Sequence, residues 1–142
     1  MQITIPNTHL DLFRKPVHNV LTTMMPDGAP QSSIVWVDYD GEYVLINTTL
    51  ERQKGRNMQA NPKVTILVID PKDSSRWVEV RGHVREMTRD SAEAHADRLT
   101  QRYCPGKRHF YRDIYPPEQK QKETRVIVKI QPVKITLDAI FK

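Results

Sequence analysis

Cysteine is almost absent from this chain of 142 residues, because Cys104 is the only one. A lone cysteine cannot form an intrachain disulfide, and it excludes both a cysteine-rich zinc site and CxxC redox chemistry. No apolar run approaches the ~18 residues that a membrane-spanning helix requires. The N-terminus also lacks the basic and apolar regions of a secretory signal. We therefore expect a cytoplasmic protein that spans no membrane.

Motifs for self-contained catalysis are missing as well. The sequence has no Walker loop, no Gly-x-Ser-x-Gly, no dinucleotide-binding glycine fingerprint and no His-Glu-x-x-His. Its five histidines are scattered, and none has metal-ligand spacing from another histidine or from a carboxylate pair. Nothing near Cys104 in the sequence would activate its thiol. We expect no metal site and no covalent catalysis, and the length predicts one domain, 1–142.

Alternation of apolar and polar residues predicts a mainly β fold. The first three strands read as a meander, closed by the turns Pro26-Asp27-Gly28 and Asp40-Gly41. The nearly continuous Val, Ile and Leu of 63–70 are typical of a strand buried on both faces. The expected strands are 17–25, 30–38, 42–48, 63–70, 77–87 and a closing pair within 125–140, bent or interrupted at Pro132.

Helices are expected between these strands. Residues 51–61 lack alternation and are rich in helix formers, and Thr48 or Thr49 could cap them. Residues 90–103 begin with Asp90 and Glu93 in capping-box spacing. A shorter helical segment is expected at 9–15. The whole pattern predicts an α+β, mainly β class: a six-stranded antiparallel β-barrel with two or three helices.

Positive charge is the most informative part of the composition. The formal net charge is +5, which fits either an anionic partner or a merely basic solvated surface. Arg52, Lys54 and Arg56 gather where the third strand hands over to a helix. Helix N-terminal amides already favour a phosphate, and these side chains supply further donors. A phosphate site and a solvated helix face are both open at this junction.

A second basic cluster runs from Arg102 into the polar, proline-rich segment 104–123. Basic residues interleaved with aromatic ones can bind single-stranded nucleic acid by stacking and phosphate contacts. They can equally form the mouth of a pocket for an anionic aromatic ligand, or a loop whose aromatic residues pack on the barrel. The cluster comprises Arg102, Lys107, Arg108, His109 and Arg112 with Tyr103, Phe110 and Tyr111.

The order of motifs resembles the pyridoxamine 5′-phosphate oxidase-like flavoproteins over roughly residues 10 to 140. The opening hairpins are similar in Pro26-Asp27-Gly28-Ala29-Pro30, in Gln31-Ser32-Ser33-Ile34-Val35-Trp36 and in Asp40-Gly41. Arg52-x-Lys54-x-Arg56-Asn57-Met58 followed by Asn61-Pro62-x-Val64 is similar to a stretch of the subgroup that uses the deazaflavin coenzyme F420. The strands at 77–82 and 125–132 also resemble the family.

The resemblance implies an FMN-binding type of split β-barrel that forms a homodimer, with the cofactor ring in a groove between subunits. Strand 31–36 would line the ring, the residues before the helix would touch the ribityl chain, and the helix start would hold the phosphate. Strand 77–82 would reach the site from one subunit or the other. The implied cofactor-binding residues are Gln31, Ser32, Ser33, Val35, Trp36, Asn47, Thr48, Thr49, Arg52, Lys54, Arg56, Asn57, Trp77 and Glu79.

The resemblance implies a reductase that transfers a hydride between reduced coenzyme F420 and an unsaturated small organic substrate. FMN is the alternative cofactor, and the basic balance favours F420 because its tail carries further negative charges. The chain lacks the extended C-terminal substrate segment of the true pyridoxamine phosphate oxidases, so oxidation of that substrate is not expected. Hypotheses from other classes are a non-catalytic cofactor-binding protein and a single-stranded nucleic-acid-binding barrel; the sheet lacks an exposed aromatic row, which disfavours the latter.

Overall fold

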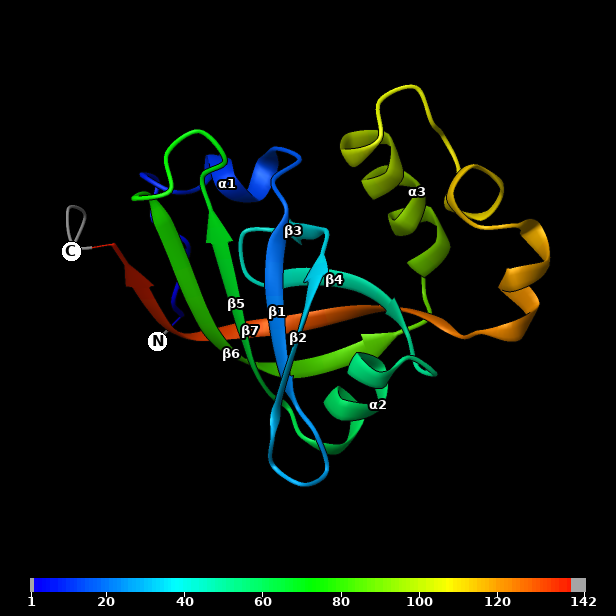
Figure 1. The fold of residues 1–142 in the computed structure, drawn as a ribbon, viewed down its shortest axis with the longest axis horizontal. Coiled ribbons are helices and arrows are strands. Elements are labelled where there is room, and N and C mark those ends of the chain that lie inside the picture. Colours follow the sequence, from blue (N-terminus) through cyan, green and yellow to red (C-terminus); the bar gives the residue numbers. More distant parts are fainter. Residues whose placement is uncertain (1, 139–142) are drawn as a thin grey trace.

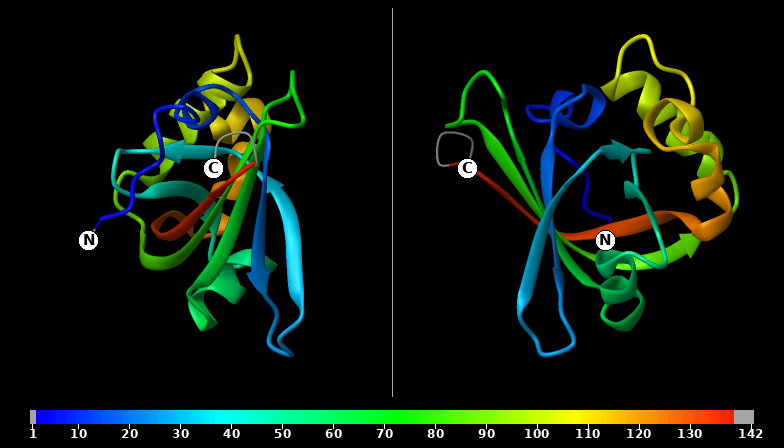
Figure 2. Two further views of the ribbon diagram at one scale, coloured as in Figure 1. Left: turned by 90° about the vertical axis from the view of Figure 1, so that its left-hand side faces the viewer. Right: turned by 45° about the vertical axis from the view of Figure 1, so that its right-hand side comes forward.

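The computed structural model describes residues 2–138 and places seven strands in one antiparallel sheet. The strand order across the sheet is β2-β1-β5-β6-β7-β4-β3. The sheet is strongly curled, so that its inner face wraps around the core (Figures 1 and 2). The prediction of a mainly β, antiparallel fold is confirmed. The strands are β1 (Asn19–Met24), β2 (Pro30–Val35), β3 (Val37–Tyr39), β4 (Val44–Thr49), β5 (Lys63–Ile69), β6 (Trp77–Thr88) and β7 (Arg125–Leu137).

The strand that the sequence predicts over 30–38 is interrupted at Trp36. The first three predicted strands therefore do not form a meander of adjacent strands. β1 pairs with β2 in one hairpin, and β3 pairs with β4 in a second hairpin. The two hairpins lie at opposite edges of the sheet, although β2 ends at Val35 and β3 begins at Val37. The break lets the chain step from one edge of the curled sheet to the other. The prediction of six strands is therefore wrong by one.

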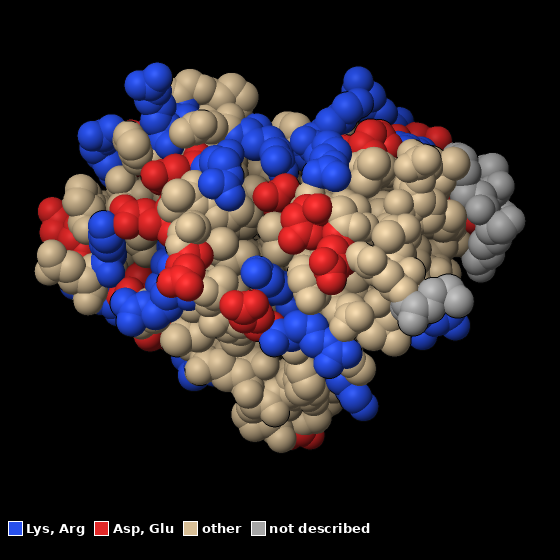
Figure 3. Space-filling view, turned by 180° about the vertical axis from the view of Figure 1, so that it is seen from behind, with Lys and Arg blue, Asp and Glu red and all other residues tan. Residues whose placement is uncertain are grey.

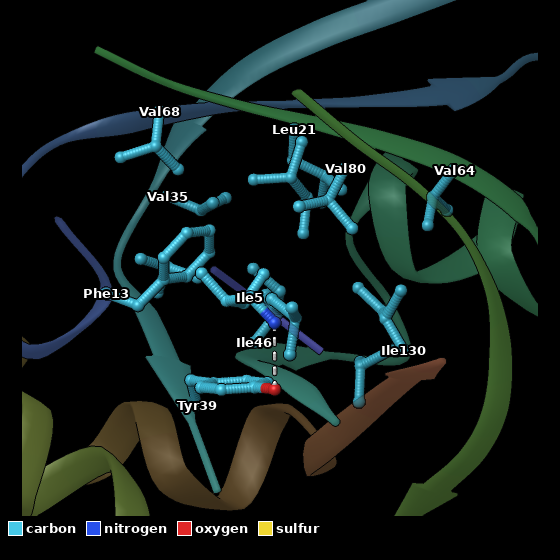
Figure 4. Close-up of a cluster of buried hydrophobic side chains, with 14 of the residues drawn as sticks. Ile5, Phe13, Leu21, Val35, Tyr39, Ile46, Val64, Val68, Val80 and Ile130 are labelled. Atoms are coloured by element: carbon cyan, nitrogen blue, oxygen red, sulfur yellow. Dashed lines mark hydrogen bonds between the residues drawn. The ribbon is translucent and has the colours of Figure 1, made fainter. Parts of the chain in front are cut away.

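The core lies inside the curl and is built from every second residue of the strands (Figure 4). Along β5, Val64, Ile66 and Val68 are buried, whereas Lys63 and Ile69 are exposed. The prediction of a strand buried on both faces is wrong there, because only the inner face of the curled sheet is covered. The N-terminal segment closes the core through the Ile5 amide, which donates a hydrogen bond to the Tyr39 hydroxyl at 3.2 Å.

β6 and β7 are the longest strands, and they pair along almost their whole length. The sequence predicts a strand pair within 125–140, but β7 is one continuous strand. A register shift between Arg81 and Gly82 of β6 lies opposite Pro132, so the bulge absorbs the missing proline donor without ending the strand. Residues 139–140 of the predicted strand lie outside the described residues.

Three α-helices and two short irregular helices complete the fold: α1 (Asp11–Arg14), α2 (Gln53–Ala60), α3 (Ala92–Tyr103), η1 (Phe110–Ile114) and η2 (Pro117–Lys122). α1 and α2 lie at opposite ends of the curled sheet, and α3 with η1 and η2 covers one side (Figure 1). Among the described residues, no helix combines the length and apolar character needed to cross a membrane.

The predicted helix caps are wrong. The residue before α2 is Arg52 and the residue before α3 is Ser91, and neither side chain makes a capping hydrogen bond. Thr48 and Thr49 lie inside β4 instead, too early to reach the first amides of α2. The start of α2 therefore keeps amide groups that no side-chain cap satisfies.

Gly55 allows α2 to begin directly against the end of β4. A Cβ atom on Gly55 would lie 2.0 Å from the carbonyl oxygen of Thr49 and 3.0 Å from its carbonyl carbon. No side chain fits into that space without moving the backbone. The absence of a side chain at this position thus fixes where the first turn of α2 lies.

We expect Gly55→Ala to destabilise the protein by about 2–3 kcal/mol, because the backbone must separate to admit the methyl group. Helix propensity alone predicts the opposite sign, a gain of up to about 1 kcal/mol. Ala60→Gly at the exposed end of the same helix is the control, with a loss below about 1 kcal/mol. Urea unfolding measures both; a stabilised Gly55→Ala protein would show that the close contact does not constrain the helix.

Candidate functional site

A pocket of about 200 Å³ opens between the strand ends and the helical side of the molecule. One wall comes from β2, β4 and the start of α2, and the other comes from α3 and η1. β7 contributes Arg125. The lining residues are Ile34, Val35, Trp36, Asn47, Thr48, Arg52, Lys54, Ala96, Leu99, Phe110, Ile114, Tyr115 and Arg125.

Arg52 and Lys54 bring positive charge that no carboxylate neutralises within the described residues. The Arg52 guanidinium lies over the Tyr115 ring, 5.2 Å from its centroid, and donates a hydrogen bond to the Tyr115 hydroxyl. Burial, and then the nearby charge of Arg52, lower the pKa of Lys54. Both cations lie beside the uncapped amides of α2, so this end of the pocket favours an anion.

Two threonine hydroxyls at the end of β4 are buried without a hydrogen-bond partner. Thr48 is 3% exposed and lines the pocket, and Thr49 lines a neighbouring hollow that shares Arg52 and Tyr115 with it. A buried hydroxyl without a partner costs about 1–3 kcal/mol, so a ligand that supplies one is favoured. Lys122 also lines this second hollow, together with the carboxylates Glu51 and Glu123.

Arg125 forms the inner end of the pocket and is held by three polar partners. Its guanidinium donates to the Tyr111 hydroxyl at 2.9 Å, to Asn47 Oδ1 at 2.8 Å and to Glu123 Oε1 at 3.0 Å. It also lies 4.2 Å from the centroid of the Phe110 ring. Glu123 neutralises its charge, so Arg125 is a rigid donor rather than a free cation.

A buried cluster around Asp38 fixes α3 against the sheet. His95 Nε2 lies 3.1 Å from Asp38 Oδ2, and Arg102 donates to Asp38 Oδ1 at 3.0 Å. Burial alone would raise the pKa of Asp38, but hydrogen bonds from His95, from the Tyr39 amide and from Arg102 outweigh it and hold that pKa well below its ordinary value. The carboxylate is therefore charged in the folded protein.

Aromatic side chains shape the mouth of the pocket. The Trp36 ring stacks on Tyr103 with centroids 5.2 Å apart and 13° between the planes, and Phe110 meets Trp36 edge-on at 6.4 Å. The Tyr103 hydroxyl accepts from the Val37 amide at 3.0 Å, and its single proton is shared between the carbonyl oxygens of Val17 at 3.1 Å and Val37 at 3.2 Å. Tyr103 thus anchors α3 to the chain at the break between β2 and β3.

Six of the predicted cofactor-binding residues line this pocket. They come from the end of β2, from β4 and from the start of α2, as the sequence places them. These residues are Val35, Trp36, Asn47, Thr48, Arg52 and Lys54.

The other predicted residues lie outside the pocket of the single chain. Asn57 is 2% exposed, and its amide donates to Thr23 at 3.0 Å and to Gln31 at 3.4 Å, so it joins α2 to the β1–β2 hairpin. Ser32 lies 2.8 Å from Thr22 on the exposed side of the same hairpin. Ser33 and Arg56 do not line the pocket, and Thr49 faces the neighbouring hollow.

Trp77 and Glu79 lie at the start of β6, and neither lines the pocket of this chain. The Trp77 amide donates to Asp138 at 3.1 Å, and Glu79 accepts from Arg81 at 3.1 Å. Both side chains remain part-exposed on the sheet.

The second basic cluster does not form an open basic surface. Arg102, His109 and Arg112 each face a carboxylate, at 3.0, 3.4 and 4.0 Å. Phe110 and Tyr111 are buried, so their rings give no platform for stacking bases. From behind, positive and negative side chains interleave over this helical side (Figure 3). Phe110 and Tyr111 pack within the fold, and Phe110 also lines the pocket, so the alternatives of a packed loop and of a pocket mouth both stay open for this segment.

The motifs in the sequence do not place several of the pocket residues in a binding site. Arg125 was part of a strand motif, but its position in the pocket depends on the pairing of β7 with β4. Ala96 and Leu99 are three residues apart and so share one helix face, which a helical projection of α3 could have flagged. Ile114 and Tyr115 follow a turn in which Arg112 has a positive φ of 120°, which no local pattern indicates.

Among residues 2–138, no group of three or more metal-ligating side chains occurs.

A curled antiparallel half-barrel with an anion-favouring pocket beside an aromatic wall defines a class of cofactor-binding folds. Residues 5–137 match the pyridoxamine 5′-phosphate oxidase family. The chain belongs to this family of oxidoreductases, as its motifs predict.

Individual relatives differ in their sequence identity to this chain and in how much of each chain the similarity covers. A pyridoxine/pyridoxamine 5′-phosphate oxidase of Bradyrhizobium diazoefficiens is 36% identical over 76 residues, which is 53% of this chain and only 35% of that protein. The solved structure of an F420 reductase is similar with a TM-score of 0.79 and 34% identity, covering 93% of this chain and 98% of that one. A conserved hypothetical protein of Mycobacterium tuberculosis shares the fold, with a TM-score of 0.69, 24% identity and coverage of 96% and 86%.

We expect Asp38→Asn to lower the free energy of unfolding by about 1–3 kcal/mol at pH 7, since two charge-assisted hydrogen bonds are lost. The pKa of Asp38 is lowered by folding, so its contribution is present above about pH 4 and is lost as the pH falls further. The difference between wild type and variant should therefore shrink in acid. Asp27→Asn in an exposed turn is the control. If the stability difference between wild type and Asp38→Asn is the same at pH 7 and pH 3, the charged Asp38 carboxylate does not stabilise the fold.

Proposed function

We propose that the protein is a coenzyme F420-dependent oxidoreductase that transfers a hydride between the deazaflavin and an unsaturated small organic molecule. The observation that carries the proposal is the pair of unneutralised cations, Arg52 and Lys54, beside the buried hydroxyl of Thr48 and a mostly apolar pocket. An anionic group attached to a flat ring system matches both halves of this site.

The residues present fit such a cofactor. Arg52, Lys54 and the first amides of α2 would hold the phosphate, and Thr48 would bond the polyol chain that precedes it. The ring would lie against β2 near Val35 and Trp36. The cofactor, when bound, supplies the hydride chemistry, while this chain binds and orients it and excludes water with Leu99 and Phe110.

FMN is the second candidate, because it carries the same phosphate at the same distance from a tricyclic ring. Two observations favour F420. The hollow beside the pocket gives room beyond the phosphate for a longer tail. Arg52 and Lys122 line it together with the carboxylates Glu51 and Glu123, so it offers space rather than a purely positive surface. The similar structure with 34% identity over nearly the whole chain is named as an F420 reductase.

We also propose that the working form is a homodimer. The pocket of about 200 Å³ is smaller than the roughly 300–1,000 Å³ of ordinary ligand sites. Ile34 lines it and yet is 66% exposed, which is unusual for a large apolar residue at a binding site. A second copy lying over this edge would enlarge the pocket and cover Ile34, and it could bring Trp77 and Glu79 to the ligand.

Lys54→Ala should weaken the binding of F420 or FMN by about 10–100-fold, the loss of one charge-assisted hydrogen bond. The affinity for riboflavin, which has no phosphate, should change little. Lys63→Ala, an exposed lysine outside the pocket, is the matched control. Fluorescence titration measures the affinity of each variant for F420, FMN and riboflavin. An affinity of Lys54→Ala for F420 and FMN equal to that of the wild type would refute the proposed phosphate site.

Analytical ultracentrifugation should give twice the 16.6 kDa mass of the chain. Ile34→Glu should shift the protein to the monomer, because it places a charge in the covered edge, whereas Ile34→Val should leave the dimer intact. A wild-type monomer at micromolar concentration would refute the two-copy site.

A further inference from the structure

Asn47 has a fixed orientation in the wall of the pocket. Its Nδ2 donates to the Ala92 carbonyl oxygen at 2.8 Å, and its Oδ1 accepts from Arg125 at 2.8 Å. A carbonyl can only accept and a guanidinium can only donate, so these two contacts decide which end of the Asn47 amide is which. The amide nitrogen consequently faces His95, 3.1 Å from its Nδ1.

This orientation decides the proton position on His95, which is fully buried. Since Asn47 presents a donor, Nδ1 of His95 must accept and carries no proton. The ring proton of the neutral imidazole then lies on Nε2, where Asp38 Oδ2 accepts it at 3.1 Å. The network therefore requires one tautomer of neutral His95.

We propose that His95 is a positioning residue of the ligand pocket, whose neutral form holds Asn47 and, through it, Arg125. This inference rests on the proposed function for the ligand that the pocket takes. Arg125 has more N–H donors than its three partners use, so some of them are open to a ligand.

A second proton on His95 breaks this arrangement. Protonated Nδ1 would meet the Asn47 amide with two donors face to face. If Asn47 turned over, its nitrogen would face Arg125, which can also only donate. If Asn47 keeps its orientation, it loses its bond to His95 and with it the support that holds it against Arg125. If it turns over, Arg125 loses one of its three anchors. In both cases the pocket holds the Arg125 donor less firmly. Ligand affinity should therefore be lower when His95 carries a second proton, beyond any change due to the ligand's own phosphate.

The charged groups around His95 oppose one another. Asp38 on β3 brings a negative charge to Nε2 of His95, and Arg102 on α3 pairs with the same carboxylate. Arg125 on β7, beyond Asn47, adds a further positive charge that Glu123 pairs.

The first test needs no ligand. Nitrogen-15 NMR of the wild-type protein at pH 8 should show His95 neutral, with its proton on Nε2. On acidification, the Asn47 side-chain amide and Arg125 Nε resonances should shift together with the His95 ring. A ring protonated on Nδ1 at pH 8, or Asn47 and Arg125 resonances that ignore the titration, would overturn the proposal.

The second test uses a matched pair of substitutions. His95→Asn keeps an acceptor at the Nδ1 position toward Asn47, and His95→Gln keeps a donor at the Nε2 position toward Asp38. Coenzyme F420 and FMN are titrated into the wild type and each variant from pH 8 to pH 5.5. The wild type should lose about tenfold more affinity than His95→Asn as the pH falls, because only the wild-type ring can take up a second proton and weaken the hold on Arg125.

The two variants should also differ at pH 8. His95→Asn should bind within about threefold of the wild type, and His95→Gln about tenfold more weakly, because Asn47 has lost its partner. A merely structural role would affect both alike; equal affinities, or equal pH profiles of wild type and His95→Asn, would overturn the proposal. If the wild type binds neither cofactor, the proposed function fails, and the NMR titration still decides the role of His95.

Discussion

The approach of Gly55 to the carbonyl of Thr49 is the constraint on which the site depends. It lets α2 begin within one turn of the end of β4, so that the helix amides and the β4 hydroxyls face the same space. Arg52 and Lys54 enter the pocket because the turn between strand and helix is this short. A single missing side chain thereby determines where positive charge gathers.

Charges in this protein fall into two groups with different consequences. Asp38 and Glu123 are matched by cations within the fold, and the resulting networks hold α3 and β7 rigidly around the pocket. Arg52 and Lys54 have no such match among the described residues. Paired buried charges fix geometry at little net gain in stability, whereas unpaired ones keep their attraction for an incoming anion. The formal charge of +5 thus says less about binding than the distribution of partners does.

Local patterns in the sequence predict most of the elements, because alternation, turns and proline positions act over a few residues. They predict the strand from Trp77 and the basic start of α2. They cannot predict that Trp36 breaks a strand, since that break is imposed by the curl of the whole sheet. They also cannot place Arg125 or Tyr115 in the pocket, because β7 reaches β4 across some 80 residues of chain and the turn at Arg112 has a positive φ. Asn57 matches a motif, yet its amide is used within the fold.

The helical wall of the pocket is carried by chain inserted between two strands that already pair. Thr88 at the end of β6 lies opposite Ile127 near the start of β7, so the sheet closes without the residues between them. That excursion supplies Ala96, Leu99 and Phe110, while the end of the pocket that carries Arg52 and Lys54 comes from β4 and the start of α2. The pocket is thus built from two separate parts of the chain: the sheet with α2, and the segment between β6 and β7. Changes in residues 89–124 can therefore reshape one wall of the pocket while β4 and α2 keep Arg52 and Lys54 in place.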